Sequence, residues 1–154
     1  LHPRVRRQRQ MCIRDRYLID MDDFKNVNDT LGHIYGDQAI VETAQCLNKV
    51  FANQDCIGRL GGDEFAVCVS YQAFDEQGLL EFIGKKAQEI CAGNRRTYTD
   101  NASSVSITSS IGVAYAPDMG DSFTELYTQA DCALYYSKAN GKDQYHIYSP
   151  KDDN

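Results

Sequence analysis

Two adjacent glycines, Gly61 and Gly62, constrain the fold of this chain more than any other feature. They separate two short segments of apolar alternation, residues 56–60 and 64–70. A tight turn between strands needs residues that adopt positive φ, and glycine does so without steric cost. The pattern therefore predicts a β-hairpin with Gly61–Gly62 as its two-residue turn.

Helical and strand patterns mix along the rest of the chain. Apolar residues recur at helical spacing in several segments, and Ser122 with Glu125 forms the capping-box pattern that begins the last of them. The predicted helices cover residues 24–31, 35–52, 75–92 and 122–141, and the predicted strands cover 17–19, 56–60, 64–70, 104–115 and 144–148. Because helices and hairpins are mixed, we predict an α+β fold with a central, largely antiparallel, five-stranded sheet wrapped by helices.

Charge is distributed unevenly over the 154 residues, which make up one domain. Residues 1–16 hold six of the sixteen Lys and Arg with one acidic residue, whereas residues 17–154 hold ten bases and twenty-one acids. An acidic domain argues against general nucleic-acid binding, so a polyanionic ligand must be held locally by a few cations, backbone N–H groups or a metal. No apolar run approaches the ~18 residues of a membrane-spanning helix. We therefore predict no nucleic-acid partner and no membrane segment.

The first sixteen residues, LHPRVRRQRQMCIRDR, show no apolar period. They resemble translated adapter or assembly-junction sequence, and we interpret residues 1–16 as a non-native segment or a disordered basic tail. The alternative is a basic tail that binds a partner or an acidic surface. We place the domain at residues 17–148 and a polar tail at 149–154, and we expect the native domain to be cut at its N-terminus.

The six cysteines show no C-x-x-C spacing, and Cys46, Cys68 and Cys91 fall inside helical or strand patterns as small core residues do. Residues 1–16 contain no apolar core of a secretory signal. We predict free thiols and a cytoplasmic domain, although its parent protein could be membrane-anchored.

Three clusters could carry chemistry. The first is Asp20-Met21-Asp22-Asp23-Phe24-Lys25, whose carboxylates follow a strand and suit a hard divalent cation. The alternative is an acidic turn that caps the next helix. The residues alone leave both readings open.

The second cluster is the hairpin tip Gly61-Gly62-Asp63-Glu64, where a phosphate or ribose can approach the backbone and the acids can meet a metal. The alternative is a hairpin with a polar tip. The third is Lys138 and Lys142, whose i,i+4 spacing would place both ammonium groups on one helix face, to neutralise a triphosphate or to satisfy a helix C-terminus. Walker-type and G-x-G-x-x-G motifs are absent from the sequence. The residues alone thus indicate a metal-dependent, phosphate-handling domain.

Four ordered blocks resemble the GGDEF family of diguanylate cyclases, and the resemblance covers about residues 17–148. The blocks are Asp20-x-Asp22-x-Phe24-Lys25-x-x-Asn28-Asp29-x-x-Gly32-His33-x-x-Gly36-Asp37, Arg59-x-Gly61-Gly62-Asp63-Glu64-Phe65, Ser110-Ile111-Gly112-Val113, and Ala130-Asp131-x-Ala133-Leu134-Tyr135-x-x-Lys138-x-x-Gly141.

The resemblance implies a domain that condenses two GTP into cyclic di-GMP and releases two pyrophosphates. It implies a fold like the palm of nucleotidyl cyclases and polymerases, with a ferredoxin-like core. Each domain would hold one GTP, and turnover would need a homodimer in which the 3′-hydroxyl of one GTP attacks the α-phosphorus of the other. An upstream sensory domain is expected and is missing from this chain. The alternative is a catalytically silent GTP-binding or regulatory module.

The resemblance also assigns catalytic and metal-binding roles by position. Asp20, Asp63 and Glu64 match catalytic residues and metal carboxylates, with the Met21 carbonyl as a further ligand. Two Mg²⁺ or Mn²⁺ ions per GTP are implied. Mg²⁺ prefers a few carboxylates together with phosphate oxygens, which fits this sparse ligand set.

Substrate-binding roles are implied in the same way. Asn28 and Asp37 match guanine-reading residues, and an Asp that accepts from guanine donors rejects adenine. The backbone at Phe24 and Lys25 matches the contact with the β- and γ-phosphates. The remaining matches are the phosphate lysines and the hairpin glycines, namely Lys138, Lys142, Gly61 and Gly62.

Two departures from the family pattern carry expectations. Lys142 keeps a charge but lacks the bidentate fork of an arginine, so weaker triphosphate binding is expected. The family's inhibitory product site, R-x-x-D, corresponds to Ala52-Asn53-Gln54-Asp55, where the arginine is missing. We expect little feedback inhibition through it.

Overall fold

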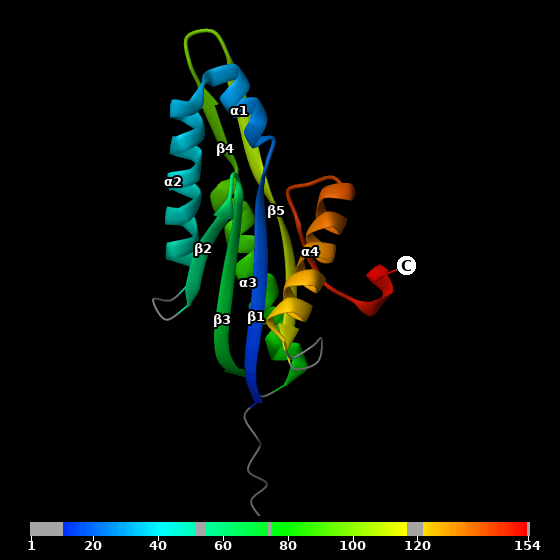
Figure 1. Ribbon diagram of the computed structural model, residues 1–154. Coiled ribbons are helices and arrows are strands. Elements are labelled where there is room, and N and C mark those ends of the chain that lie inside the picture. The colour runs from blue at the N-terminus through cyan, green and yellow to red at the C-terminus, as the bar shows by residue number, and fades with distance from the viewer. Residues whose placement is uncertain (1–10, 52–54, 74, 117–121, 154) are drawn as a thin grey trace, which may run out of the picture.

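The computed structural model describes residues 11–51, 55–73, 75–116 and 122–153 (Figure 1). The strands are β1 (Met11–Asp22), β2 (Cys56–Gly61), β3 (Glu64–Ala73), β4 (Arg96–Thr99), β5 (Ser104–Ala116) and β6 (Tyr145–Ile147). The helices are α1 (Phe24–Leu31), α2 (His33–Val50), α3 (Glu76–Asn94) and α4 (Phe123–Ala139), followed by the short 3₁₀ helix η1 (Pro150–Asp153).

The described strands form one sheet in the order β2-β3-β1-β5-β4, with β6 also paired to β5. Only the β5–β6 pairing is parallel in this part of the chain. The predicted α+β fold with a largely antiparallel sheet is confirmed, but the sheet has six strands and not five. The strand missed from the sequence is β4, whose residues Arg-Thr-Tyr-Thr offer no apolar run and pair with the start of β5.

Strand β1 begins at Met11, so the boundary predicted at Tyr17 lies inside it. Arg14 and Arg16 lie opposite Ser70 and Cys68 of β3. Backbone hydrogen bonds to neighbouring strands can extend a strand whatever its side chains are. The part of β1 before Tyr17 therefore forms without the apolar periodicity from which strands were predicted. The non-native origin of residues 1–16 stays a prediction. Residues 149–154, predicted as a polar tail, include η1.

Several predicted features lie outside the described residues. These are residues 1–10 of the basic segment, the end of the second predicted helix at Ala52, and Ala52-Asn53-Gln54 of the product-site positions.

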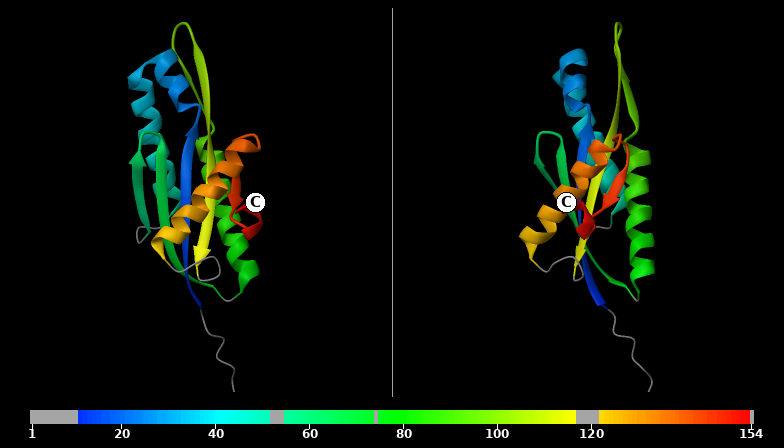
Figure 2. Two further views of the ribbon diagram at one scale, coloured as in Figure 1. Left: turned by 45° about the vertical axis from the view of Figure 1, so that its right-hand side comes forward. Right: turned by 90° about the vertical axis from the view of Figure 1, so that its right-hand side faces the viewer.

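The two faces of the sheet carry different helices. Tyr17, Ile19 and Met21 of β1 belong to one buried cluster, whereas Leu18 belongs to another that packs against α4. Figure 2 shows α3 and α4 on opposite faces of the sheet. Because side chains alternate along a strand, Asp20 and Asp22 follow Leu18 onto the α4 face.

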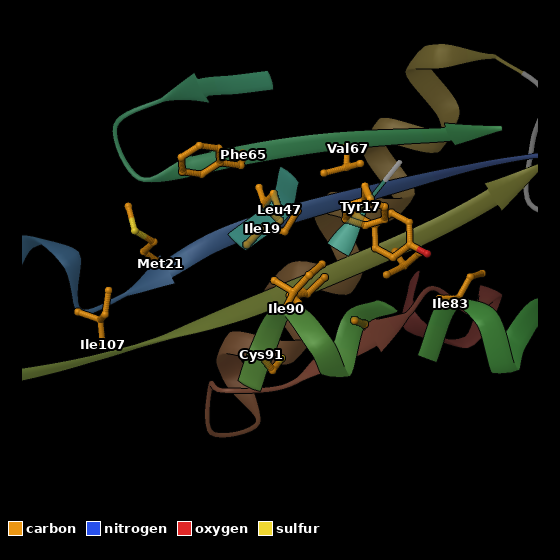
Figure 3. Close-up of a cluster of buried hydrophobic side chains, with 14 of the residues drawn as sticks. Tyr17, Ile19, Met21, Leu47, Phe65, Val67, Ile83, Ile90, Cys91 and Ile107 are labelled. Atoms are coloured by element: carbon orange, nitrogen blue, oxygen red, sulfur yellow. The ribbon is translucent and has the colours of Figure 1, made fainter. Parts of the chain in front are cut away.

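The larger cluster fills the space between the sheet and helices α2 and α3 (Figure 3). Leu47 of α2 and Ile83 and Ile90 of α3 are fully buried against Tyr17 and Ile19. Burying a side chain of this size stabilises a fold by roughly 1.5–3 kcal/mol. This core holds β1 in place and therefore sets the position of the acidic turn at its end.

The smaller cluster depends on Gly112 of β5. A Cβ atom at Gly112 would lie under 3.0 Å from backbone atoms of Ala130 and Leu134, so α4 rests directly on the strand. The helix begins with the predicted capping box, in which Glu125 N donates to Ser122 Oγ at 3.1 Å and Ser122 N donates to Glu125 Oε2 at 3.3 Å. Lys138 in the last turn of α4 is thereby placed over the end of β1.

The cysteines whose side chains the structure describes are all free, as predicted. Burial raises the pKa of the Cys91 thiol to about 11, so this thiol stays protonated and packs as a small apolar group. None of the described helices has the length and apolar character needed to cross a bilayer.

Candidate functional site

The site forms where the end of β1 meets the tip of the β2–β3 hairpin. Asp20 lies directly opposite Glu64 of β3 and Ser110 of β5. Met21 N donates to Asp63 O at 3.1 Å, which fastens the hairpin tip to β1. The structure therefore brings the three predicted catalytic carboxylates, Asp20, Asp63 and Glu64, to one place.

The hairpin turn lies one residue later than predicted. Gly61 still pairs with Glu64, and the two turn residues are Gly62 and Asp63. Gly62 has φ 50°, in the left-handed region, and its carbonyl accepts from Arg59 Nε at 2.8 Å. An irregularity in the register between Arg59 and Gly61 accounts for the shift, because one extra residue on β2 moves the turn along the chain.

Electrostatics at the end of β1 favour a cation. Lys138 Nζ lies 2.9 Å from a carboxylate oxygen of Asp20, whose side chain is only 15% exposed. Burial raises the pKa of Asp20 above its ordinary value; the hydrogen bond from Lys138 opposes this, and the charge of Asp63 adds to it. Burial raises the pKa of Glu64 as well, with further contributions from the charges of Asp20 and Asp131. The carboxylates thus carry more negative charge than the single lysine neutralises.

The predicted metal ligands fit a shared site rather than a closed protein cage. Within the described residues, no group of three or more His, Cys, Asp or Glu side chains is arranged to hold a metal. Mg²⁺ is commonly held by one or two carboxylates with waters and substrate phosphates, so Asp20 and Asp63 are sufficient donors in kind. The side chain of Met21 is buried in the core, where its sulfur accepts from Thr43 Oγ1 at 3.2 Å, so only its backbone could serve.

The predicted guanine-reading residues come together where α1 meets α2. Asn28 of α1 is half-buried, and its side chain occupies the space that a Cβ at Gly36 would need. Asp37, the next residue of α2, is exposed. Gly36 is a residue whose role the sequence left unassigned, although a glycine in the first turns of a helix is a signal of close approach.

Helix α1 begins beside the site with an unusual residue. Asp23 precedes Phe24 with φ 61° and makes no side-chain capping bond to the helix. The carboxylate instead accepts from Lys142 Nζ at 2.9 Å. This hydrogen bond, and the charge of Asp23, raise the pKa of the Lys142 ammonium. The first backbone N–H groups of a helix, here at Phe24 and Lys25, lack intrahelical acceptors and can face an anion.

Lys142 does not share a helix face with Lys138, contrary to the prediction. Helix α4 ends at Ala139, and Lys142 lies in a turn where Gly141, Lys142 and Asp143 have φ of 113°, 61° and 48°. Gly141 adopts the positive φ that ends helices. Lys142 N donates to Ser137 O at 3.1 Å, so the turn folds back onto α4.

Asp22 anchors this turn rather than joining the other carboxylates. Its side chain is buried and accepts from Thr108 Oγ1 at 2.6 Å, Ser110 Oγ at 2.7 Å and Asp143 N at 3.1 Å. Of the three acids in the first cluster, only Asp20 faces the hairpin acids. The divalent-cation reading of this cluster therefore rests on Asp20, because Asp22 is satisfied by hydroxyl and amide donors and Asp23 is paired with Lys142.

Comparison with known proteins relates this arrangement to a family. A family model described as "Diguanylate cyclase, GGDEF domain" matches residues 4–144. The bifunctional diguanylate cyclase/cyclic di-GMP phosphodiesterase MucR of Pseudomonas aeruginosa is 34% identical over 96% of this chain and 22% of its own length. Diguanylate cyclase A of Treponema denticola is 35% identical over 82% of this chain and 33% of its own length. The chain thus spans about a fifth to a third of these curated relatives.

A solved structure has the same fold. The GGDEF domain of YfiN (TpbB) from Pseudomonas aeruginosa superposes with a TM-score of 0.79 at 31% identity, covering 92% of this chain and 80% of that one.

Proposed function

The chain belongs to the GGDEF family of diguanylate cyclase domains, and from this premise we propose that it condenses two GTP into cyclic di-GMP with release of two pyrophosphates. The observation that carries the proposal is the meeting of Asp20, Asp63 and Glu64 beside Lys138. Carboxylates with excess negative charge next to a lysine suit a metal-bound triphosphate.

In the proposed mechanism the protein binds and orients the triphosphate. Lys138 leaves Asp20 to bind one phosphate and Lys142 binds another, while the free N–H groups at the start of α1 donate hydrogen bonds to the terminal phosphates. Asp20, Asp63 and the Met21 carbonyl would hold two Mg²⁺ or Mn²⁺ ions, with Glu64 at the metal or at the attacking hydroxyl. When bound, the metal supplies neutralisation of the phosphates and a more acidic hydroxyl. Gly61 and Gly62 leave room for the nucleotide because they carry no side chain.

Base selection is proposed for Asn28 and Asp37. A carboxylate that accepts from the N1–H and amino group of guanine loses both donors when adenine is offered. The close packing of Asn28 on Gly36 supports this role, since it holds the amide against the residue that precedes Asp37.

Each domain would bind one GTP, so joining two of them needs two copies facing each other. We therefore infer a homodimer, formed in the cytoplasm, where GTP is available. An upstream sensory domain would control the pairing of the copies.

A catalytically silent GTP-binding or regulatory module is the second candidate. The observation that favours it is the ion pair of Lys138 with Asp20, which engages a candidate metal ligand. The two candidates differ in turnover and not in the predicted binding of GTP.

The experiment is incubation of the purified chain with GTP and Mg²⁺, with mass detection of cyclic di-GMP. Asp63→Asn should lower the product by about 100-fold or more, because a pre-organised charge at the reacting phosphate is lost. Glu89→Gln, an exposed change on α3, is the matched control for net charge. Binding of GTP without product in the unaltered chain would favour the silent module, and absence of binding would contradict both.

A further inference from the structure

Asp23 has no role in the chemistry proposed above, yet its carboxylate forms an ion pair with Lys142, one of the two lysines proposed to bind phosphate. Asp23 Oδ1 and Lys142 Nζ lie 2.9 Å apart at the surface, with side chains 56% and 44% exposed. We propose that Asp23 sets the affinity of the site for a nucleoside triphosphate by competing with it for Lys142. The inference rests on the proposed function, in which Lys142 binds phosphate.

The Asp23 carboxylate is not hydrogen-bonded to helix α1. It makes no capping bond, although its residue occupies the N-cap position, and its backbone is left-handed. Within the described part of the chain, this carboxylate accepts a hydrogen bond from Lys142 alone. The pairing with the lysine is therefore the carboxylate's interaction with the site.

Lys142 can exchange partners only through its side chain, because its backbone is held. Asp143 N donates to Asp22, and the Asp143 carboxylate lies 2.8 Å from Arg95 Nε. Lys142 N is bonded to Ser137 O. With the turn held at three points, the flexible four-carbon stem of the lysine must swing from Asp23 to a phosphate.

Lys138 leaves Asp20 and Lys142 leaves Asp23 when each binds a phosphate, but the two steps differ in what happens to the acid. Asp20 is a candidate metal ligand, so a bound cation replaces the lysine that leaves it. Asp23 is paired with Lys142 and is not among the proposed metal ligands, so nothing in the proposed site replaces the lysine there. Loss of this ion pair therefore opposes binding of the triphosphate.

The test measures binding without turnover. The probe is 3′-deoxy-GTP with Mg²⁺, which lacks the attacking hydroxyl, titrated by calorimetry. Asp23→Asn removes the charge, and asparagine tolerates a left-handed backbone, so the fold is retained. Because binding to the variant no longer breaks an exposed ion pair, its Kd for the probe should be about two- to fivefold lower than that of the unaltered chain. The gain should shrink at high salt, since exposed charges are screened.

Three further variants make the result specific. Lys142→Met should weaken binding, and adding Asp23→Asn to it should bring no gain. Glu89→Gln controls for net charge, because Glu89 is exposed on α3, across the sheet from α4. Asp23→Gly is a second variant that suits the left-handed backbone.

Each outcome decides the proposal. An unchanged or higher Kd in both Asp23 variants, an equal gain in Glu89→Gln, or a gain that persists without Lys142 would overturn it. Binding of the probe to the unaltered chain is measured first. Failure of that chain to bind would contradict the proposed function itself.

Discussion

Two lysines pair with acids at the end of β1, and the two pairs depend on different parts of the molecule. Lys138 extends from the regular last turn of α4 to Asp20, which is 15% exposed. Lys142 extends from a turn of three left-handed residues to Asp23, which is 56% exposed. The same side-chain chemistry is thus held by core packing in one case and by polar contacts in the other.

The two lysines should therefore be displaced by different kinds of mutation. Lys138 is placed by the contact of α4 with Gly112, a long-range apolar contact. Lys142 is placed by the hydrogen bonds of Asp22 and Asp143. Changes to the core should displace the first, and changes to buried polar groups should release the second.

The largest effect is expected from Gly112→Ala. The added Cβ would meet backbone atoms of α4 at under 3.0 Å, and backbone cannot rotate away. We expect a loss of about 3 kcal/mol in the free energy of unfolding, at the upper end for overpacking. Urea unfolding measures it. Gly58→Ala on exposed β2, where no atom lies within 4 Å of the added group, is the matched control. Equal stability of the two variants would contradict the packing account.

Asp22→Ala should act mainly on the Lys142 turn. The carboxylate oxygen that accepts from Asp143 N and Thr108 Oγ1 would be removed, so buried donors lose their acceptor. The expected loss is about 2 kcal/mol in the free energy of unfolding, with faster hydrogen exchange at the Asp143 amide. Asp29→Ala, an exposed change on α1, serves as the control. Unchanged exchange at Asp143 would show that Asp22 does not hold the turn.

Asp20→Asn should give the smallest effect, and one that depends on pH. Because burial raises the pKa of Asp20 in the folded state above 3.8, the folded protein favours the protonated acid. Its contribution to stability is present below 3.8 and is lost as pH rises through the raised pKa. Asp20→Asn should therefore be more stable than the unaltered chain near pH 7, with the difference vanishing toward pH 4.

Urea unfolding at several pH values measures this difference. The stability difference between Asp20→Asn and the unaltered chain should grow when Lys138→Met is added to both, since Lys138 lowers the pKa of Asp20. A difference that is constant with pH would rule out the electrostatic explanation.

Local patterns were enough to predict several elements. Helix α1 has its predicted bounds, and the capping box at Ser122 forms as expected. Both features depend on residues within one or two helical turns of each other, so a short stretch of sequence includes all the residues that interact. The hairpin turn was wrong by one residue because the irregularity between Arg59 and Gly61 depends on pairing with β3.

Local sequence patterns were sufficient to identify the family blocks, the bounds of helix α1 and the glycines of the hairpin. The different roles of the three acids depend on contacts between distant segments: Asp20 meets the hairpin acids, Asp22 anchors a turn and Asp23 pairs with Lys142. A two-residue period places side chains on a face, but their partners come from strands and turns up to 121 residues away. The register between distant segments is set by the packing of the whole core, which no local pattern contains.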